Sequence, residues 1–304
     1  MNFDLEQNKR LSEIEDIIKK YLPEEKGYYK TVIEALNYSL TAGGKRLRPM
    51  LMQETYRMFG ADEDEILHSF MVAIEMIHTY SLVHDDLPAM DNDEYRRGKK
   101  TTHKVYGEAM AILAGDGLLN GAYELASAAF DLVDESSADI LSKYKKIIAA
   151  SKILSSKAGI HGMIGGQVID IESEGRLLTK DRINMMYRLK TSALMEASMM
   201  IGAVLAGANE EEINIIENIA RDIGLAFQIR DDILDVTASY ELLGKPINSD
   251  SKNDKTTYLA IMDIEKAKEE VEIITDRAMK AYQTLAYNNE YLEMLIVKLI
   301  NREK

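Results

Sequence analysis

The chain has 304 residues, 46% of them hydrophobic, no cysteine and a formal net charge of −14. The lack of cysteine excludes disulfides, zinc thiolates and thiol nucleophiles, and the negative charge argues against nucleic acid as a main partner. The first twenty residues are too charged for a signal peptide, and no run of 18 uncharged apolar residues exists, so we expect a cytoplasmic protein without a membrane span.

Helical periodicity and strong helix formers fill most of the chain. The predicted helices are 27–41, 46–59, 62–87, 107–130, 136–157, 179–206, 210–236 and 257–284, with another near the C-terminus. Alternation of Val, Ile and Thr is nowhere sustained, so strands are not expected. Non-helical pieces or helix breaks are predicted at Gly43-Gly44, Gly159–Gly166 and Gly244–Lys255. The pattern favours an all-α protein with a single domain over residues 1–304.

An acidic cluster closes the predicted helix 62–87. Its carboxylates are Asp85, Asp86 and Asp91, and Pro88 lies between them. Because the residue before a proline avoids the helical region, the helix should end there and Asp91 should return by a turn. Arg96 and Arg97 follow, and arginines grip phosphate oxygens well. The other interpretation is a charged loop that balances itself.

A second acidic cluster lies in the predicted helix 210–236. Asp231 and Asp235 are four residues apart, which puts both carboxylates on one helix face, with Asp232 adjacent. A solvated acidic face is the alternative, but apolar neighbours such as Ile229 and Ile233 weaken it. Like charges this close repel and need a cation, and carboxylate oxygens suit Mg²⁺ shared with a phosphate-bearing ligand.

The segment GGKRLRP over residues 43–49 is a candidate anion site. It is not a P-loop, because GxxxxGK[ST] is absent. A glycine pair lets the backbone approach a ligand closely, and Lys45 with Arg48 can hold an anion without metal. The alternative is the N-terminal turn of a helix that carries surface charges.

These motifs occur in a fixed order with GMIGGQVIDI, KTSALMEAS and FQIRDDILDV, followed by GKP and NDKTTY. The ordered set resembles the trans-polyprenyl diphosphate synthases, most closely the bacterial farnesyl diphosphate synthases. The resemblance implies an all-α isoprenoid synthase fold of roughly ten core helices around a central cavity, usually as a homodimer. It also implies head-to-tail condensation of isopentenyl diphosphate with an allylic diphosphate.

The resemblance assigns roles residue by residue. Asp85, Asp91 and Asp231 would bind magnesium, supported by Asp86 and Asp235, with about three ions around the diphosphate and Mn²⁺ as a substitute. The allylic diphosphate would be held by Arg96, Lys190, Lys245 and Lys255. The isopentenyl diphosphate would be held by Gly44, Lys45, Arg48, His78 and Arg97. Thr191 and Gln228 would lie beside the allylic carbon, and Gln167 and Asp170 would line the cavity. His103 and His161 receive no role.

Product length is expected to depend on the residues just before the first cluster. Tyr80 and Ser81 lie about one helical turn before Asp85, where a growing prenyl tail would extend. In related bacterial enzymes an aromatic residue here accompanies the farnesyl product, so we expect a farnesyl diphosphate synthase. An ordinary core aromatic is the alternative reading of Tyr80.

Other functions stay open at this point. A geranyl or geranylgeranyl diphosphate synthase would use the same chemistry. A terpene cyclase would normally replace the second DDxxD pattern and would not need the segment 43–48. A non-catalytic subunit of a partner synthase commonly loses one aspartate cluster, and this chain keeps both.

Overall fold

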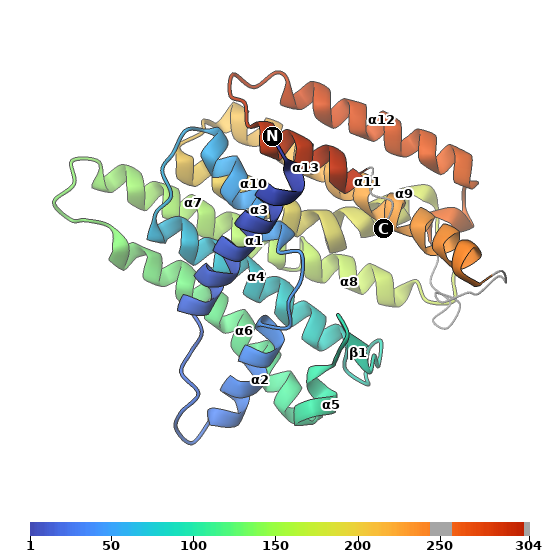
Figure 1. Ribbon diagram of the computed structural model, residues 1–304, viewed down its shortest axis with the longest axis horizontal. Coiled ribbons are helices and arrows are strands. Elements are labelled where there is room, and N and C mark those ends of the chain that lie inside the picture. The colour runs from blue at the N-terminus through green and yellow to red at the C-terminus, as the bar shows by residue number, and fades with distance from the viewer. Residues whose placement is uncertain (244–256, 301–304) are drawn as a thin grey trace. The chain divides into compact units, whose positions relative to one another are not determined.

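The computed structural model describes residues 1–243 and 257–300 (Figure 1). The described chain forms two compact units, Met1–Ser151 and Lys152–Lys304, and each is considered by itself below. The expectation that one domain spans the whole chain stays a prediction. Almost every element is a helix, as the sequence predicted.

The first unit is built around α4, Glu65–Asp85, which has α6, Glu108–Ala128, alongside it (Figure 1). The other elements are α1 Phe3–Lys20, α2 Lys30–Leu40, α3 Leu47–Met58, α5 Thr102–Tyr106 and the short 3-10 helix η1 Ala129–Leu132. A hairpin of two-residue strands, β1 Tyr95–Arg96 and β2 Lys99–Lys100, follows the first acidic cluster. Helix α7, Ile140–Ala158, continues from this unit into the second.

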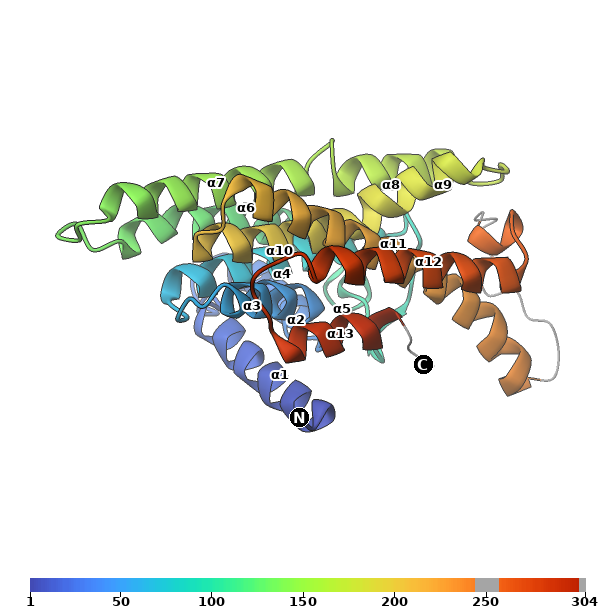
Figure 2. The same cartoon turned by 90° about the horizontal axis from the view of Figure 1, so that it is seen from above.

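The second unit is organised around the long helix α11, Glu210–Leu243, which packs against α10, Ala193–Ala206, and α12, Ile264–Tyr282. Figure 2 shows α12 running beside α11. The remaining elements are α8 Met163–Glu172, α9 Lys180–Tyr187, the π-helical turn η2 Arg188–Ser192, the 3-10 turn η4 Tyr258–Ala260 and α13 Glu290–Ile300. Asp222 of α11 accepts two hydrogen bonds of 2.6 Å from Arg277 of α12, which joins the two helices.

The predicted helices are confirmed with shifted ends. Helix 62–87 is α4, which begins at Glu65 because the Asp64 side chain accepts a hydrogen bond from the Leu67 N–H and caps it. It ends at Asp85, three residues before Pro88. The segment 179–206 is two α-helices with a π-helical turn between them, and 257–284 starts with a 3-10 turn before α12.

Three expectations about local structure were wrong. Helix α1 was missed, although Ile14, Ile17 and Ile18 form a buried stripe along it. The prediction of a break at Gly159–Gly166 fails at its end, because Gly165 and Gly166 lie inside α8. The hairpin of β1 and β2 was also not expected. The predicted break at Gly244–Lys255 lies outside the described residues.

Two helical stretches, Glu65–Asp85 and Lys180–Ala206, are long and apolar enough to cross a membrane by length and composition. Within the described chain, 72% and 78% of their apolar windows are buried, as in the core helices of a soluble protein. The expectation that no segment spans a membrane stays a prediction.

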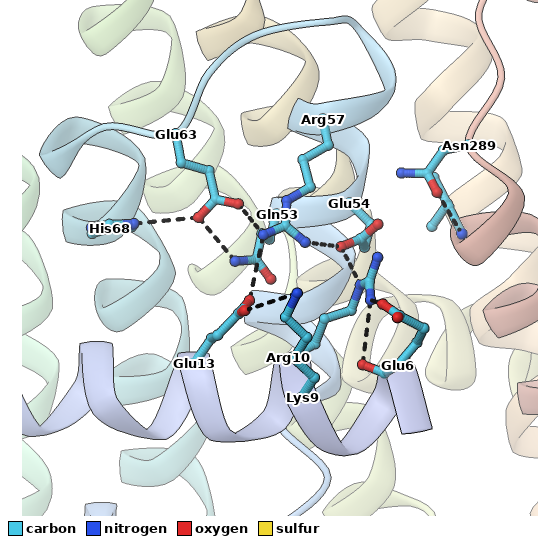
Figure 3. Close-up of polar contacts among 11 residues, drawn as sticks. Glu6, Lys9, Arg10, Glu13, Gln53, Glu54, Arg57, Glu63, His68 and Asn289 are labelled. Atoms are coloured by element: carbon cyan, nitrogen blue, oxygen red, sulfur yellow. Dashed lines mark hydrogen bonds and ion pairs between the residues drawn. The ribbon is translucent and has the colours of Figure 1, made fainter. Parts of the chain in front are cut away.

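A polar network ties α1 to α3 in the first unit (Figure 3). The Glu54 carboxylate, 1% exposed, accepts a hydrogen bond of 2.7 Å from Arg10 Nε and one of 2.6 Å from Arg57 Nη1. Arg57 also pairs with Glu63, which accepts a hydrogen bond of 3.0 Å from the Gln53 amide. Because both arginines are partly desolvated, the single charge of Glu54 stabilises each of them.

We therefore expect Glu54→Gln to lower the free energy of unfolding by about 2–3 kcal/mol, since it leaves two partly buried guanidinium groups facing a neutral amide. Urea unfolding followed by circular dichroism measures the change. Glu265→Gln is the matched control, because Glu265 is 78% exposed in its ion pair with Lys268 and should change stability by less than about 1 kcal/mol. Equal losses in the two variants would contradict the role given to Glu54.

Candidate functional site

The first acidic cluster is closed by a backbone turn. The Asp91 N–H donates to the Asp85 carbonyl over 2.9 Å, and the Asn92 N–H donates to the Leu87 carbonyl over 3.1 Å. Asn92 has a φ of 53°, a left-handed conformation that asparagine adopts at low cost. The turn predicted from Pro88 is therefore present, and it brings Asp91 back to the end of α4.

Asp86 lies differently from Asp85 and Asp91. Its carboxylate is 4% exposed and accepts hydrogen bonds of 2.7 and 2.9 Å from Arg96 Nε, while Arg96 Nη2 lies 2.6 Å from Asp86 Oδ1. Burial raises the pKa of Asp86 from its ordinary value, and Arg96 opposes that rise. Asp86, predicted to support magnesium binding, thus contacts Arg96, predicted to bind the allylic diphosphate. Both roles stay predictions.

Arg97 and the glycine pair form a second contact in the first unit. Arg97 Nη1 donates to the Gly43 carbonyl. Gly44 has a φ of 142°, and a Cβ atom there would lie 2.6 Å from Arg97 Nη1. The positive φ favours glycine, and a side chain at this position would have to displace the Arg97 guanidinium. The structure therefore brings Arg97 onto the segment 43–48, as the assignment to one site requires.

Arg46 was given no role, yet it holds this segment in place. Its side chain is fully buried and donates from Nε to Glu15 and from Nη1 to Glu75, each over 2.7 Å. Its Nη2 donates to the Leu40 carbonyl over 2.7 Å, and its φ of 45° is left-handed. In the segment KRLR, Arg46 is buried and Arg48 is half-buried. The sequence does not reveal this difference between the two arginines.

Positive charge gathers around His78. The pKa of Arg48 is lowered to about 10, mainly by burial and also by the charge of Arg97, while the attraction of Glu75 opposes the shift. Arg48 Nε is buried without a hydrogen-bond partner among the described residues. Burial, followed by the charges of Arg48 and Arg97, holds the pKa of His78 well below its ordinary value. The imidazole of His78 is therefore neutral, and the nearby guanidinium groups are not fully paired with carboxylates. Such an environment favours the binding of an anion.

Tyr80 and Ser81 lie at the end of α4. The Tyr80 side chain is 6% exposed, and its hydroxyl has no hydrogen-bond partner within residues 1–243 and 257–300. Its ring packs edge-on against His84 at 5.8 Å, and burial raises the pKa of its hydroxyl to about 12. Ser81 Oγ donates to the His78 carbonyl over 2.9 Å. Tyr80 is thus held by apolar packing and by no polar contact of its hydroxyl.

In the second unit the π-helical turn η2 carries Lys190 and Thr191. Lys190 Nζ lies 2.5 Å from Asp170 Oδ2 of α8, and Thr191 Oγ1 donates to Gln228 Oε1 of α11 over 2.9 Å. Turns of this kind recur at functional sites because the extra residue re-aims side chains. The structure thus brings together Lys190, Thr191, Gln228 and Asp170, which sequence separates by up to 58 positions.

Two glycines let neighbouring helices close on this turn. A Cβ on Gly166 of α8 would lie 2.1 Å from the Lys190 backbone nitrogen. A Cβ on Gly224 of α11 would lie 2.3 Å from Ser192 Oγ and 2.5 Å from Ser192 Cβ. The close approach requires glycine at both positions, and sequence analysis gave neither of them a role.

The second acidic cluster is divided by burial. Asp231 is half-buried, Asp235 is exposed, and Asp232 is 6% exposed. The Tyr187 hydroxyl donates to Asp232 over 2.5 Å, and burial together with this carboxylate raises the pKa of Tyr187, so its hydroxyl keeps its proton. Lys245 and Lys255, predicted to hold the allylic diphosphate, lie outside the described residues.

Within the described parts of the chain, no group of three or more His, Asp or Glu side chains could hold a metal ion by itself. The donors available are nevertheless the right kind, because Asp85 and Asp91 carry carboxylates and one turn brings their backbones together. Mg²⁺ commonly takes one or two carboxylates and completes its coordination with phosphate oxygens and water. The residues therefore fit magnesium that arrives with a phosphate-bearing substrate, and do not form a closed protein cage.

A family model described as polyprenyl synthetase matches residues 29–294. The chain is 42% identical over 273 residues to a farnesyl diphosphate synthase of Geobacillus stearothermophilus, covering 90% of this chain and 89% of that protein. It is 40% identical over 292 residues to a geranylgeranyl diphosphate synthase of Cyanophora paradoxa, covering 95% and 93%. An FPP/GFPP synthase from Zymomonas mobilis superposes with a TM-score of 0.83 at 31% identity, covering 98% and 99%.

The chain therefore belongs to the polyprenyl synthetase family and is a prenyltransferase with the all-α isoprenoid synthase fold. The family resemblance and the fold class predicted from the sequence are confirmed. Its relatives differ in product length, since one makes farnesyl and another geranylgeranyl diphosphate by name.

The lowered pKa of His78 gives a pH prediction. The unfolded chain takes up this proton near pH 6.5 but the folded chain does so only at lower pH, so the contribution of His78 to stability is complete above about pH 6.5 and is lost as pH falls. We expect unfolding free energy to fall between about pH 6.5 and 5 less steeply in His78→Gln than in the parent, by up to about 1.4 kcal/mol per pH unit.

Urea unfolding at several pH values measures this slope, and His161→Gln, at an exposed position, is the matched control. Identical slopes in the parent and in His78→Gln would contradict a suppressed protonation of His78.

We expect Gly224→Ala to reduce unfolding free energy by about 2 kcal/mol or more, because its Cβ would overlap Ser192. Gly121→Ala is the matched control, since the nearest atom to its Cβ is Met76 Sδ at 3.7 Å and helix propensity should even add up to about 1 kcal/mol. Thermal unfolding compares them, and a neutral Gly224→Ala would contradict the close approach at this turn.

Proposed function

We propose that the chain condenses isopentenyl diphosphate with dimethylallyl and then geranyl diphosphate, and so makes farnesyl diphosphate. The observation that carries this proposal is the pair of phosphate-suited sites on separate units. One is the cationic cluster around His78, and the other is the π-helical turn that presents Lys190 and Thr191. We further propose that both units act as a single catalytic domain, which the family match over residues 29–294 supports.

The isopentenyl diphosphate binds, in this proposal, to Gly44, Lys45, Arg48, His78 and Arg97. Burial lowers the pKa of both Arg48 and Arg97, and the charge of Arg97 also lowers the pKa of Arg48, so a dianionic group would stabilise both. A neutral His78 can donate one N–H without adding repulsion between cations. The Arg97 guanidinium lies against the backbone of Gly44, so the two together would present N–H groups to a diphosphate oxygen.

The allylic diphosphate binds, in this proposal, to Arg96, Lys190, Lys245 and Lys255, with Asp85, Asp91 and Asp231 as magnesium ligands and Asp86 and Asp235 in support. Bound magnesium, with about three ions and Mn²⁺ as a substitute, would neutralise the charge that develops on the leaving diphosphate. Lys190 would exchange Asp170 for a phosphate oxygen, which its flexible stem permits.

Cleavage of the allylic C–O bond releases diphosphate and leaves an allylic cation. The Thr191 and Gln228 oxygens, already in hydrogen-bond contact, would face this cation and stabilise it by their dipoles. The isopentenyl double bond attacks the cation and forms the new C–C bond. A proton then leaves the adjacent carbon, and the released diphosphate accepts it.

The farnesyl product is the finer part of the proposal. Tyr80 lies about one helical turn before Asp85, and its buried ring would stop a prenyl tail that grows along α4. Similarity to farnesyl diphosphate synthases supports this, whereas similarity to a geranylgeranyl diphosphate synthase supports the longer product as the second candidate.

We also propose a cytoplasmic homodimer. Val105, Ile112 and Leu113 on α5 and α6 are exposed apolar side chains, and a second copy covering them would remove this surface from water. Analytical ultracentrifugation tests this part, and a monomer at micromolar concentration would contradict it.

The function is tested with the pure protein, Mg²⁺, isopentenyl diphosphate and each allylic primer. We expect diphosphate release and a prenyl product, both abolished by EDTA and reduced by about a thousandfold in Asp91→Asn and in Asp231→Asn. Cyclised hydrocarbons would instead indicate a terpene cyclase. No diphosphate release would contradict the enzyme and favour a non-catalytic subunit.

We expect Tyr80→Ala to make chains longer than the parent product, because it removes the ring that ends the tail site. Tyr80→Phe is the matched control, since it keeps the ring and loses only a hydroxyl without a partner among the described residues. Products are dephosphorylated and separated by chain length. Unchanged products in Tyr80→Ala would show that Tyr80 is not the floor of the cavity.

A further inference from the structure

Asp232 stands apart from the other two carboxylates of its cluster. It is 6% exposed, whereas Asp231 is half-buried and Asp235 is exposed. Successive residues of an α-helix are rotated by about 100° around its axis, so Asp232 points to a different side of α11 than Asp231. Asp232 therefore lies on a buried side of α11, while Asp231 and Asp235 share the other side.

The buried side holds two tyrosines. Asp232 Oδ2 accepts a hydrogen bond of 2.5 Å from the Tyr187 hydroxyl and one of 2.7 Å from the Tyr258 backbone N–H. Tyr187 is 6% exposed and Tyr258 is 0% exposed, and their rings stack with centroids 6.4 Å apart. A carboxylate with two donors in such an apolar setting makes short, charge-assisted hydrogen bonds.

This contact joins three segments of the second unit. Tyr187 is the last residue of α9 and directly precedes the π-helical turn with Lys190 and Thr191. Tyr258 opens η4, where the described chain resumes before α12. Asp232 follows Asp231 on α11. One carboxylate thus links the start of the Lys190–Thr191 turn to the helix that carries Gln228.

We propose that Asp232 is a positioning residue and not a magnesium ligand: through Tyr187 it fixes the π-helical turn, so that Lys190 and Thr191 face the allylic diphosphate. This inference rests on the proposed function. It divides the DDxxD pattern into two carboxylates for metal and one for alignment. The division follows from burial and from the two hydrogen bonds, and composition or spacing alone does not reveal it.

The test uses the full chain with Asp232→Asn, Tyr187→Phe and both changes together. Displacement of a binding group by a fraction of an ångström costs rate steeply, so we expect kcat with the allylic primer to fall and its KM to rise, each about tenfold. The KM for isopentenyl diphosphate and the Mg²⁺ concentration for half-maximal rate should stay within about twofold of the parent. Asp231→Asn should raise that Mg²⁺ concentration by more than about tenfold.

Tyr282→Phe is the matched control. Its hydroxyl is also buried and hydrogen-bonded, to the Asn289 backbone at 3.0 and 3.2 Å in the same unit, and within the described residues neither hydrogen bond reaches a proposed site residue. It should lower the thermal midpoint and leave the kinetic constants unchanged. If Tyr187→Phe behaves like this control, or if Asp232→Asn raises the Mg²⁺ requirement as Asp231→Asn does, the positioning role is wrong.

A second measurement needs neither metal nor substrate. Thermal midpoints of the parent, the two single variants and the double variant form a double-mutant cycle, in which non-additive shifts are expected because the two groups share one hydrogen bond. Additive shifts would overturn the contact. If the parent transfers no prenyl group, the proposed function fails, but this cycle still decides whether Asp232 holds Tyr187.

Discussion

Like charges held close together constrain both units of this protein. In the first unit, burial and the neighbouring charge of Arg97 lower the pKa of Arg48, and Arg48 Nε is buried without a hydrogen-bond partner among the described residues. Each unit also carries an acidic cluster at or near the end of a predicted helix, and its carboxylates repel one another unless a cation binds between them. Such groups cost folding free energy that a bound ligand of opposite charge recovers. In the proposed function, diphosphate bound together with magnesium would supply both kinds of counter-charge at once.

The surrounding structure has to hold these charged segments in place. Arg46 does so for the segment 43–48, because its buried guanidinium engages Glu15 and Glu75 and leaves Arg48 less neutralised. The π-helical turn does so in the second unit. Gly166 and Gly224 leave room for this turn, which directs Lys190 toward Asp170 and Thr191 toward Gln228. Neutral packing and a few buried ion pairs thus hold the reactive charges in place.

Much of the fold could be predicted because helical periodicity and scarce proline act locally. Helix α4 and its end before Pro88 came from such signals, and so did the turn that returns Asp91. Helix α1 was missed because its charged residues outweigh the narrow stripe of Ile14, Ile17 and Ile18. The break expected at Gly159–Gly166 was wrong at Gly166, since that glycine serves a contact between helices and not a turn. A single sequence does not distinguish these two uses of glycine.

The sequence by itself determined the chemical inventory: two carboxylate clusters, the cationic segments and the ordered motifs that identify a polyprenyl synthetase. These are properties of residue type and spacing, so they can be recognised before the fold is known. Only the tertiary structure decided how each group is used. Asp86 pairs with Arg96, Asp232 turns inward to Tyr187, and Tyr80 is buried without a partner for its hydroxyl among the described residues. Burial and hydrogen bonding depend on which helices meet, and residues far apart in the chain set them.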